Sequence, residues 1–275
     1  MCYIIRLEDG SFIIVDGGVD TTKERYEDRI YNILKKQAPD PDNIVIAAWL
    51  FSHAHDDHVD IFEYFCESYA DKVTVERFIY NLPSSEQASA ANDKWDRSAK
   101  VREWMDEYFP DVPKTKAHPG QTFYIRNAKI DILYTLDVYE SALTDFNNSS
   151  VVFAVEAEGQ KMMFLGDYMD EGKTLMSLYS AQTLKSDIVQ ITHHGIGGRG
   201  GAINNLYKAI APTYAFWPGL RIYEHNTYRD LYNEAENQYI VKNSEIFMAE
   251  DNVHVFTVKD CTVEVYDTVA AYLAS

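Results

Sequence analysis

The chain has 275 residues, 46% of them hydrophobic, which fits one large α/β domain over residues 1–275. Its formal net charge of −18 repels polyanions at long range, so strong general nucleic-acid binding is not expected. No apolar stretch approaches the ~20 residues of a membrane span, and three scattered cysteines without a CxxC spacing indicate reduced thiols in a cytoplasmic protein.

Strand and helix patterns alternate along the first half of the chain. Residues 3–7 and 11–16 flank Glu8-Asp9-Gly10, a turn sequence that predicts a β-hairpin. Further along, apolar runs predict strands, and apolar positions three or four residues apart predict helices. We expect strands at 44–51 and 73–80, helices at 21–36, 58–69 and 85–108, and a proline-rich loop at 110–120.

The second half repeats this arrangement. It opens with two expected hairpins, one over 122–135 with its turn near Asn127, and one in which strands 150–157 and 160–165 flank Glu158-Gly159. There follow a helix at 171–180, strands at 187–191 and 213–217, a helix at 227–237 and a strand-rich tail. Hairpins followed by helices in each half favour two sheets packed face to face with helices outside.

The most informative motif is HAHDDH at residues 53–58, directly after the apolar run 44–51. Neutral imidazoles and carboxylates are good ligands for zinc, iron or manganese. No packing role requires three histidines and an aspartate at this spacing. We therefore predict a metal site, in which one ion is held by His53 and His55 and a second by Asp57 and His58.

Two aspartates end other apolar runs. Asp167 follows Gly166 after strand 160–165, where a carboxylate is well placed to bridge two cations. The alternative is that Asp167 caps the next helix. Asp16 is a candidate to accept the free N–H of a metal-bound histidine, and a turn role before Gly17-Gly18 explains it equally well.

The pair His193-His194 follows strand 187–191. One of these histidines is expected to complete the second metal site. Because His193 comes first after the strand, we predict it as the ligand and His194 as a group that lines the substrate pocket or supports the ligands. The reverse assignment stays open.

Taken together, these motifs resemble the metallo-β-lactamase-fold superfamily over nearly the whole chain. The residues that carry the resemblance are, in the order of the family, Asp16, His53-x-His55-x-Asp57-His58, Gly166-Asp167 and His193-His194-Gly195. The resemblance implies an α/β (α+β) fold with a four-layer αββα sandwich, a dinuclear metal site, and hydrolysis as the usual reaction.

More narrowly, the segment 147–152 (NNSSVV), taken with the later motifs, is similar to the hydrolase domains of DNA-uptake competence proteins. That subgroup has an asparagine-containing motif where many relatives place a further histidine, and no histidine lies between His118 and His193 here. The resemblance implies that water or a weak contact from Asn147 completes the first metal site. It also favours a phosphodiester or related small ester over a lactam as substrate.

The implied chemistry is attack by a metal-activated water, with zinc as the first choice for the two divalent ions and manganese or iron as alternatives. Besides Asp57, the predicted catalytic residue is His225, as proton donor or oxyanion stabiliser. Arg199, in the glycine-rich run 197–201, is a candidate for binding a substrate phosphate or carboxylate. The competing interpretations are a diiron oxidoreductase, which would normally need a flavin-binding partner domain, and a non-catalytic metal-binding or sensor module on the same fold.

Overall fold

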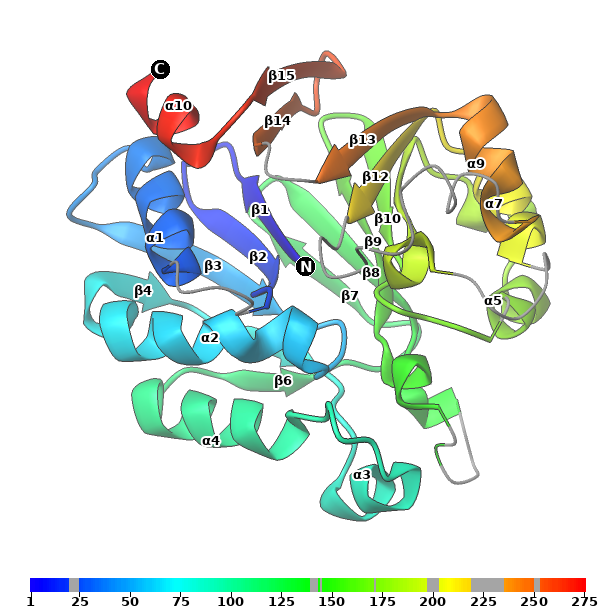
Figure 1. Ribbon diagram of the computed structural model, residues 1–275, viewed down its shortest axis with the longest axis horizontal. Helices are drawn as coiled ribbons and strands as arrows, with labels where there is room; N and C mark the ends of the chain where they lie inside the picture. The colour runs from blue at the N-terminus through cyan, green and yellow to red at the C-terminus, as the bar shows by residue number, and fades with distance from the viewer. Residues whose placement is uncertain are drawn as a thin grey trace.

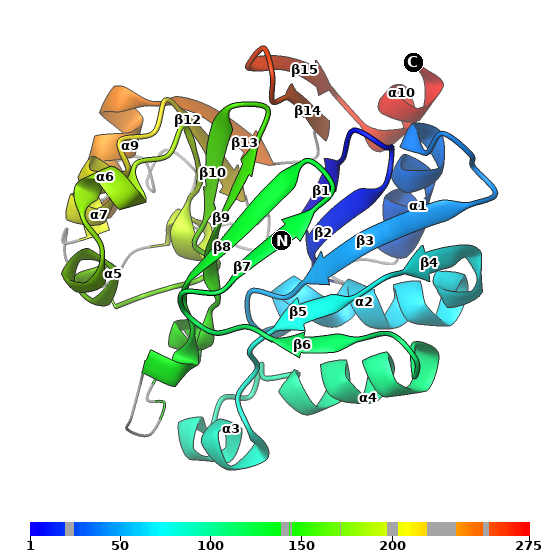
Figure 2. The same ribbon diagram turned by 180° about the vertical axis from the view of Figure 1, so that it is seen from behind.

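The computed structural model describes residues 1–19, 25–138, 143, 145–170, 172–196, 203–218, 235–249 and 253–275. Within these ranges the strands form two large sheets and a separate hairpin. The first sheet contains, in spatial order, β1 (Cys2–Arg6), β2 (Phe12–Asp16), β3 (Ile44–Leu50), β5 (Phe78–Tyr80) and β6 (Lys114–Lys116), with β4 (Val73–Val75) also paired to β3. Figure 2 shows these strands side by side across the sheet, from β1 at one edge to β6 at the other.

The second sheet joins an antiparallel half to a parallel half. Its strands are, in spatial order, β13 (Glu245–Ala249), β12 (Tyr214–Pro218), β11 (Ile188–Gln190), β10 (Gln160–Phe164), β9 (Val152–Ala157), β8 (Ala128–Tyr134) and β7 (Thr122–Ile125). Strands β7 to β10 pair antiparallel, whereas β10 to β13 pair parallel. The separate hairpin consists of β14 (Val253–Thr257) and β15 (Thr262–Tyr266).

Helices cover the outer face of each sheet, and Figure 1 shows α1, α2 and α4 on one side of the molecule and α5, α7 and α9 on the other. The α-helices are α1 (Tyr26–Gln37), α2 (Asp56–Tyr69), α3 (Ser85–Ala91), α4 (Ser98–Tyr108), α5 (Lys173–Leu178), α6 (Ala181–Leu184), α7 (Ile203–Ile210), α9 (Gln238–Asn243) and α10 (Val269–Ala274). The short 3₁₀ segments are η1 (Ala70–Lys72), η2 (Leu136–Val138), η3 (Phe146–Ser149), η4 (Thr192–Gly195) and η5 (Ala235–Asn237). This arrangement is the predicted αββα sandwich.

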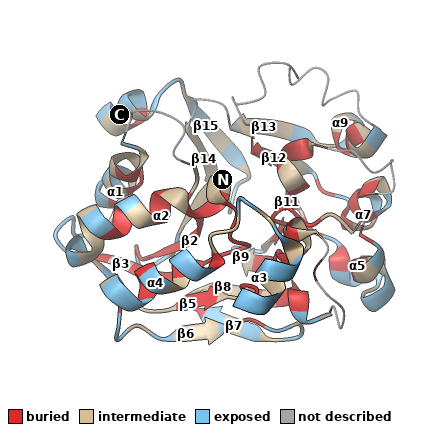
Figure 3. Cartoon of the chain, turned by 60° about the horizontal axis from the view of Figure 1, so that its bottom comes forward, coloured by how far each residue is buried: buried red, intermediate tan, exposed pale blue. Residues whose placement is uncertain are grey.

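Three hydrophobic clusters correspond to the three interfaces of the sandwich. Alternate residues of one strand face different clusters: Phe164 of β10 packs between the sheets, whereas Met163 packs under the helices of the second sheet. In β2, likewise, Ile13 faces the second sheet and Ile14 faces α1 and α2. Because both faces of the central strands are buried, these strands read as continuous apolar runs. Figure 3 shows the resulting contrast between buried strands and exposed outer helix faces.

Several predicted boundaries are wrong. The single helix expected over 85–108 is two helices, because Asn92 adopts a left-handed conformation (φ 49°, ψ 41°) that ends α3. The strand expected at 73–80 is two short strands, β4 and β5, that pair with different parts of β3. The loop expected at 110–120 contains the edge strand β6. The expected helix 227–237 lies mostly outside the described residues.

The chain end packs against the first helix of the fold. The side-chain amide of Gln37 at the end of α1 donates a hydrogen bond to the hydroxyl of Tyr272 in α10, with an N–O distance of 2.5 Å. The ammonium of Lys36 lies 5.2 Å from the centroid of the same Tyr272 ring. Among the helices that the structure describes, none combines the length and apolar character needed to cross a bilayer.

Candidate metal centre

The histidine motif lies where β3 passes into α2. His55 is the N-cap of α2, so Asp57 and His58 occupy the first helical turn, where carboxylates interact favourably with the helix dipole. His53 and His58 are fully buried, and His55 is 8% exposed. The short passage from strand to helix therefore directs four potential ligands into one confined volume.

Asp167 reaches the same place from the second sheet, after β10. Gly166 has a positive φ of 56°, and a Cβ there would lie 2.9 Å from the hydroxyl of Ser150, so glycine is required at this turn. The side chain of Gln190 accepts the Gly166 N–H at 2.7 Å, and Ser150 accepts the Asp167 N–H at 3.0 Å. These contacts fix a carboxylate that is 2% exposed.

His194, rather than His193, is the histidine of the second sheet that joins this group. Both residues have left-handed backbone conformations, with φ of 45° for His193 and 54° for His194. Nε2 of His194 lies 2.8 Å from Oδ2 of Asp57 and 3.5 Å from Oδ2 of Asp167. Nδ1 of His193 instead contacts the carbonyl of Ile196 at 2.9 Å. The geometry therefore favours the reverse assignment that the sequence left open, through a backbone conformation that strand periodicity does not reveal.

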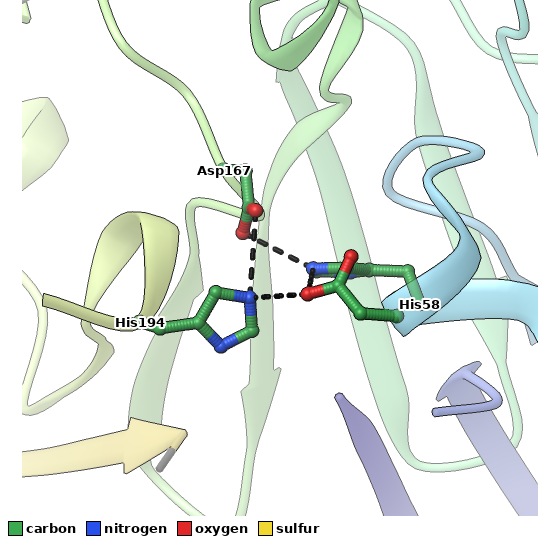
Figure 4. A group of neighbouring side chains, drawn as sticks. His58, Asp167 and His194 are labelled. Carbon is green, nitrogen blue, oxygen red and sulfur yellow. Dashed lines mark ion pairs between the residues drawn. The ribbon is translucent and has the colours of Figure 1, made fainter. Parts of the chain in front are cut away.

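The donor atoms form two groups that share Asp167. In each group, one donor atom per residue lies within 4.8 Å of all the others, a spacing that ligands of one ion can have. The first group is His53, His55 and Asp167, and the second is Asp57, His58, Asp167 and His194. Figure 4 shows His58, Asp167 and His194 approaching a common point from separate segments. Residues 53–58 divide between the two groups as His53 and His55 on one side and Asp57 and His58 on the other, and their role as metal ligands stays a prediction.

Buried polar atoms at the centre lack hydrogen-bond partners. The Nε2 atoms of the four histidines and Oδ1 of Asp167 are buried, and none makes a hydrogen bond within the described ranges. Nε2 of His55 faces Asp93, at 3.5 Å, whereas Nε2 of His58 and of His194 lie at ion-pair distances from Asp167 and Asp57. A buried polar atom without a hydrogen bond costs about 1–3 kcal/mol, so a bound group that satisfies several of these atoms would be favoured. Imidazole nitrogens and carboxylate oxygens converging in this way fit the ligand set of a divalent transition metal.

Asp16 supports this arrangement from the end of β2. Its Oδ2 lies 2.8 Å from Nδ1 of His58, and its Oδ1 accepts the Ser52 N–H at 2.7 Å. The Ser52 hydroxyl donates to Oδ2 of Asp16, also at 2.7 Å. Ser52 was not singled out from the sequence, although a serine between an apolar run and a histidine cluster is a signal that could have identified it.

Burial and neighbouring charges set the protonation of the centre. Burial lowers the pKa of His53 well below its usual range, and the neighbouring His58 acts in the same direction. For His58 burial opposes protonation, but the charges of Asp167 and Asp57 outweigh it and raise the pKa to about 10. The pKa of Asp167 is lowered because His58 and His194 outweigh its burial. The centre thus attracts positive charge, and a bound cation would displace the proton of His58.

Three residues predicted to bind substrate or to take part in catalysis belong to neither donor group. Asn147 lies in η3 beside Phe146, whose ring stacks on His55 with centroids 4.8 Å apart. The buried Oδ1 of Asn147 makes no hydrogen bond with the described residues, and its role in binding substrate stays a prediction. Arg199 and His225 lie outside the described residues.

Sequence reasoning also missed the segment 92–97 between α3 and α4, which packs against the histidine motif. Its backbone forms an isolated bridge between Asp96 and His55, and the carboxylate of Asp93 lies 3.5 Å from Nε2 of His55. The sequence Asn92-Asp93 could have indicated a turn here, since both residue types favour turns. The amphipathic spacing of the residues that follow, in α4, concealed it.

Comparisons with known proteins identify the fold. No protein-family model matches the chain, and no curated protein matches its sequence. The metallo-beta-lactamase fold protein YhfI from Bacillus subtilis matches 90% of this chain and 88% of its own, with 10% identity and a TM-score of 0.51. Zn²⁺-bound PqqB from Methylobacterium extorquens matches 70% of this chain and 59% of its own, with 12% identity and a TM-score of 0.44. A diphosphatase from the PhnP family matches 76% of this chain and 68% of its own, with 12% identity and a TM-score of 0.43.

Proposed function

We propose that this chain, which has the metallo-β-lactamase fold, is a metal-dependent hydrolase of a phosphodiester or related small ester. The observation that carries the proposal is the pair of donor groups that share Asp167, in which every residue except Asp57 is buried. A carboxylate that faces two adjacent sets of imidazoles is suited to bridge two cations. Neutral imidazole and carboxylate donors favour zinc, with manganese and iron as alternatives.

Two ions held there would supply an activated water and would polarise an oxygen bonded to the phosphorus or carbonyl carbon under attack. The surrounding residues hold the donor side chains in place. Asp16 and Ser52 orient His58, while Ser150 and Gln190 hold the turn that presents Asp167. Deep burial of His53 and Asp167 excludes bulk water from the donors and strengthens their electrostatic interactions.

The preference for a phosphodiester is supported by the resemblance to the hydrolase domains of DNA-uptake competence proteins, which rests on the motif 147–152 and on His193-His194-Gly195. The net charge of −18 points to a small substrate, because a long polyanion would be repelled over its whole length. Bound cations would offset the carboxylates at the centre, so one phosphate group can still be accommodated there.

The test combines metal analysis with a substrate panel. Protein purified without chelator should contain zinc, manganese or iron, and the chelated protein reloaded with each metal should hydrolyse bis-p-nitrophenyl phosphate faster than p-nitrophenyl phosphate, p-nitrophenyl acetate or a chromogenic lactam. Asp57→Ala should abolish turnover, while Asp71→Ala, at an exposed position, should not change it. Full activity in metal-free protein, or a folded Asp57→Ala variant with undiminished turnover, would contradict the proposal.

A further inference from the structure

The segment 92–97 is fixed to the histidine motif by its backbone. The N–H of Arg97 donates to the carbonyl of Ala54 at 2.7 Å, and the N–H of Asp56 donates to the carbonyl of Trp95 at 3.1 Å. The guanidinium of Arg97 adds a hydrogen bond to Asp60 at 3.1 Å. Contacts to the residues before and after His55 therefore hold the segment against the N-terminus of α2.

Within this segment, the two carboxylate oxygens of Asp93 have different surroundings. Oδ1 accepts the N–H of Trp95 at 2.8 Å, which closes a side-chain turn. Oδ2 lies 3.5 Å from Nε2 of His55. The side chain of Asp93 is 25% exposed and that of His55 is 10% exposed, so the pair is largely shielded from water.

His55 is oriented differently from the other three histidines of the centre. In those three, Nδ1 has a protein partner: Ser52 for His53, Asp16 for His58 and the carbonyl of Pro218 for His194. Their Nε2 atoms face the carboxylates of the donor groups, Asp167 for His53 and His58 and Asp57 for His194. For His55 it is Nε2 that faces a carboxylate outside the two donor groups.

Asp93 does not behave as a ligand itself. It is absent from the set of donors that lie within 4.8 Å of one another, so it approaches His55 without approaching both His53 and Asp167. A ligating histidine commonly donates the N–H of its other ring nitrogen to a carboxylate, and this contact fixes the tautomer and the orientation of the ring.

We propose that Asp93 is a positioning residue that accepts the Nε2–H of His55 and so leaves Nδ1 of His55 free to bind the ion of the first group. The inference rests on the proposed function in one respect only, that the first group binds a metal. The first group has three protein donors where the second has four. It consequently depends more on having each imidazole in the correct tautomer before the ion arrives.

Substitution by asparagine distinguishes this role from a structural one. Asparagine keeps a single carbonyl oxygen, which the Trp95 N–H retains, so the turn is preserved and an NH₂ donor replaces Oδ2. His55 must then accept at Nε2 and carry its proton on Nδ1, the nitrogen that the ion requires. Asp93→Asn should therefore impair the first site even though the segment keeps its shape, and Asp93→Ala should impair it by removing the acceptor.

The direct readout is the ¹⁵N chemical shifts of the His55 ring in chelated, ¹⁵N-histidine-labelled protein, at a pH where this ring is neutral. We expect the Nε2–H tautomer in the parent protein and a shift toward the Nδ1–H tautomer in Asp93→Asn. Asp71→Asn, in the exposed pair with Lys72, is the matched control and should leave the His55 signals unchanged. Identical His55 tautomers in the parent and in Asp93→Asn would overturn the inference.

The second readout is zinc titration against a competing chelator. In both Asp93 variants one of the two zinc equivalents should bind about 10–100-fold more weakly, while the other keeps its affinity. An Asp93→Asn protein with two unchanged equivalents would show that Asp93 only shapes the turn. A parent protein that binds no zinc would instead contradict the proposed function, and the tautomer measurement would still decide the role of Asp93.

Discussion

Nδ1 of His58 lies 2.8 Å from Oδ2 of Asp16, and both side chains are 0% exposed. The contact joins the end of β2 to the first turn of α2 and directs Nε2 of His58 toward Asp167, 3.2 Å away. Asp16 itself has a left-handed backbone conformation, with φ 59°, and its carbonyl accepts the indole N–H of Trp49 at 3.0 Å. Because Asp16 and His58 are buried and contact each other directly, replacing either one should have a specific, measurable effect.

Replacing Asp16 should weaken the second metal site. Asp16→Asn keeps the shape of the side chain but removes the charge that orients His58. Loss of such a partner typically lowers metal affinity about 10–100-fold. Zinc titration with a competing chelator measures the change. Asp42→Asn, on the exposed turn before β3, is the control and should bind zinc normally. Unaltered affinity in a folded Asp16→Asn protein would show that the contact is only structural.

The shared position of Asp167 predicts a difference in metal stoichiometry. Asp167 belongs to both donor groups, whereas Asp57 belongs only to the second. Asp167→Ala should therefore lose both equivalents of metal, and Asp57→Ala should retain one. Elemental analysis after dialysis against a fixed free zinc concentration gives the counts. Two retained equivalents in Asp167→Ala would argue against a bridging carboxylate.

The adjacent histidines of η4 provide a matched pair of variants. Because Nε2 of His194 faces Asp57 and Asp167 while Nδ1 of His193 contacts a backbone carbonyl, the two alanine variants should differ. His194→Ala should lose one metal equivalent and its metal-dependent turnover. His193→Ala should keep both equivalents, with at most a small loss of stability. The opposite pattern would restore the sequence-based assignment of His193.

The raised pKa of His58 predicts how the stability of chelated protein depends on pH. Its folded-state pKa is about 10 and its reference value is 6.5, so between these values the folded state binds more protons than the unfolded state. The stabilisation is complete below about pH 6.5 and should be lost as pH rises toward 10, with a slope of at most about 1.4 kcal/mol per pH unit. Denaturant unfolding at several pH values measures this slope.

The control for that measurement is His58→Gln, which removes the titrating group and should flatten the decline between neutral and alkaline pH. His194, whose pKa is also raised, contributes in the same direction and would leave a residual slope. A free energy of unfolding that stays constant or rises over this range in the parent protein would show that His58 is not held as an imidazolium.

Much of the fold could be predicted because its elements have strong local patterns. The strands around Ile46 and Val155 are apolar on both faces, which predicts sheets covered on both sides. The break between α3 and α4 could not be seen in the same way, because Asn92 interrupts a polar stretch, 85–108, that holds no proline or glycine. Edge strand β6 was missed because a three-residue strand beside prolines has almost no periodicity.

The candidate site divides along similar lines. Residues 53–58 are contiguous, so a role as metal ligands could be predicted from their spacing alone. Asp167 could be proposed as a bridging carboxylate from its place at a strand end, but its distance from residues 53–58 could not be predicted, because the contact joins two sheets. The choice between His193 and His194 depends on two consecutive left-handed residues, and the approach of Asp93 to His55 depends on tertiary packing. No one-dimensional pattern contains either fact.

The donor groups draw on both sheets: His53 and His58 follow β3 of the first, while Asp167 and His194 follow strands of the second. An ion bound by both sets would act as a removable cross-link between regions more than a hundred positions apart. Like a disulfide spanning a long loop, it would restrict the unfolded chain as well as stabilise the native one. Metal occupancy should then govern how readily the two sheets of the sandwich separate under mechanical force or in denaturant.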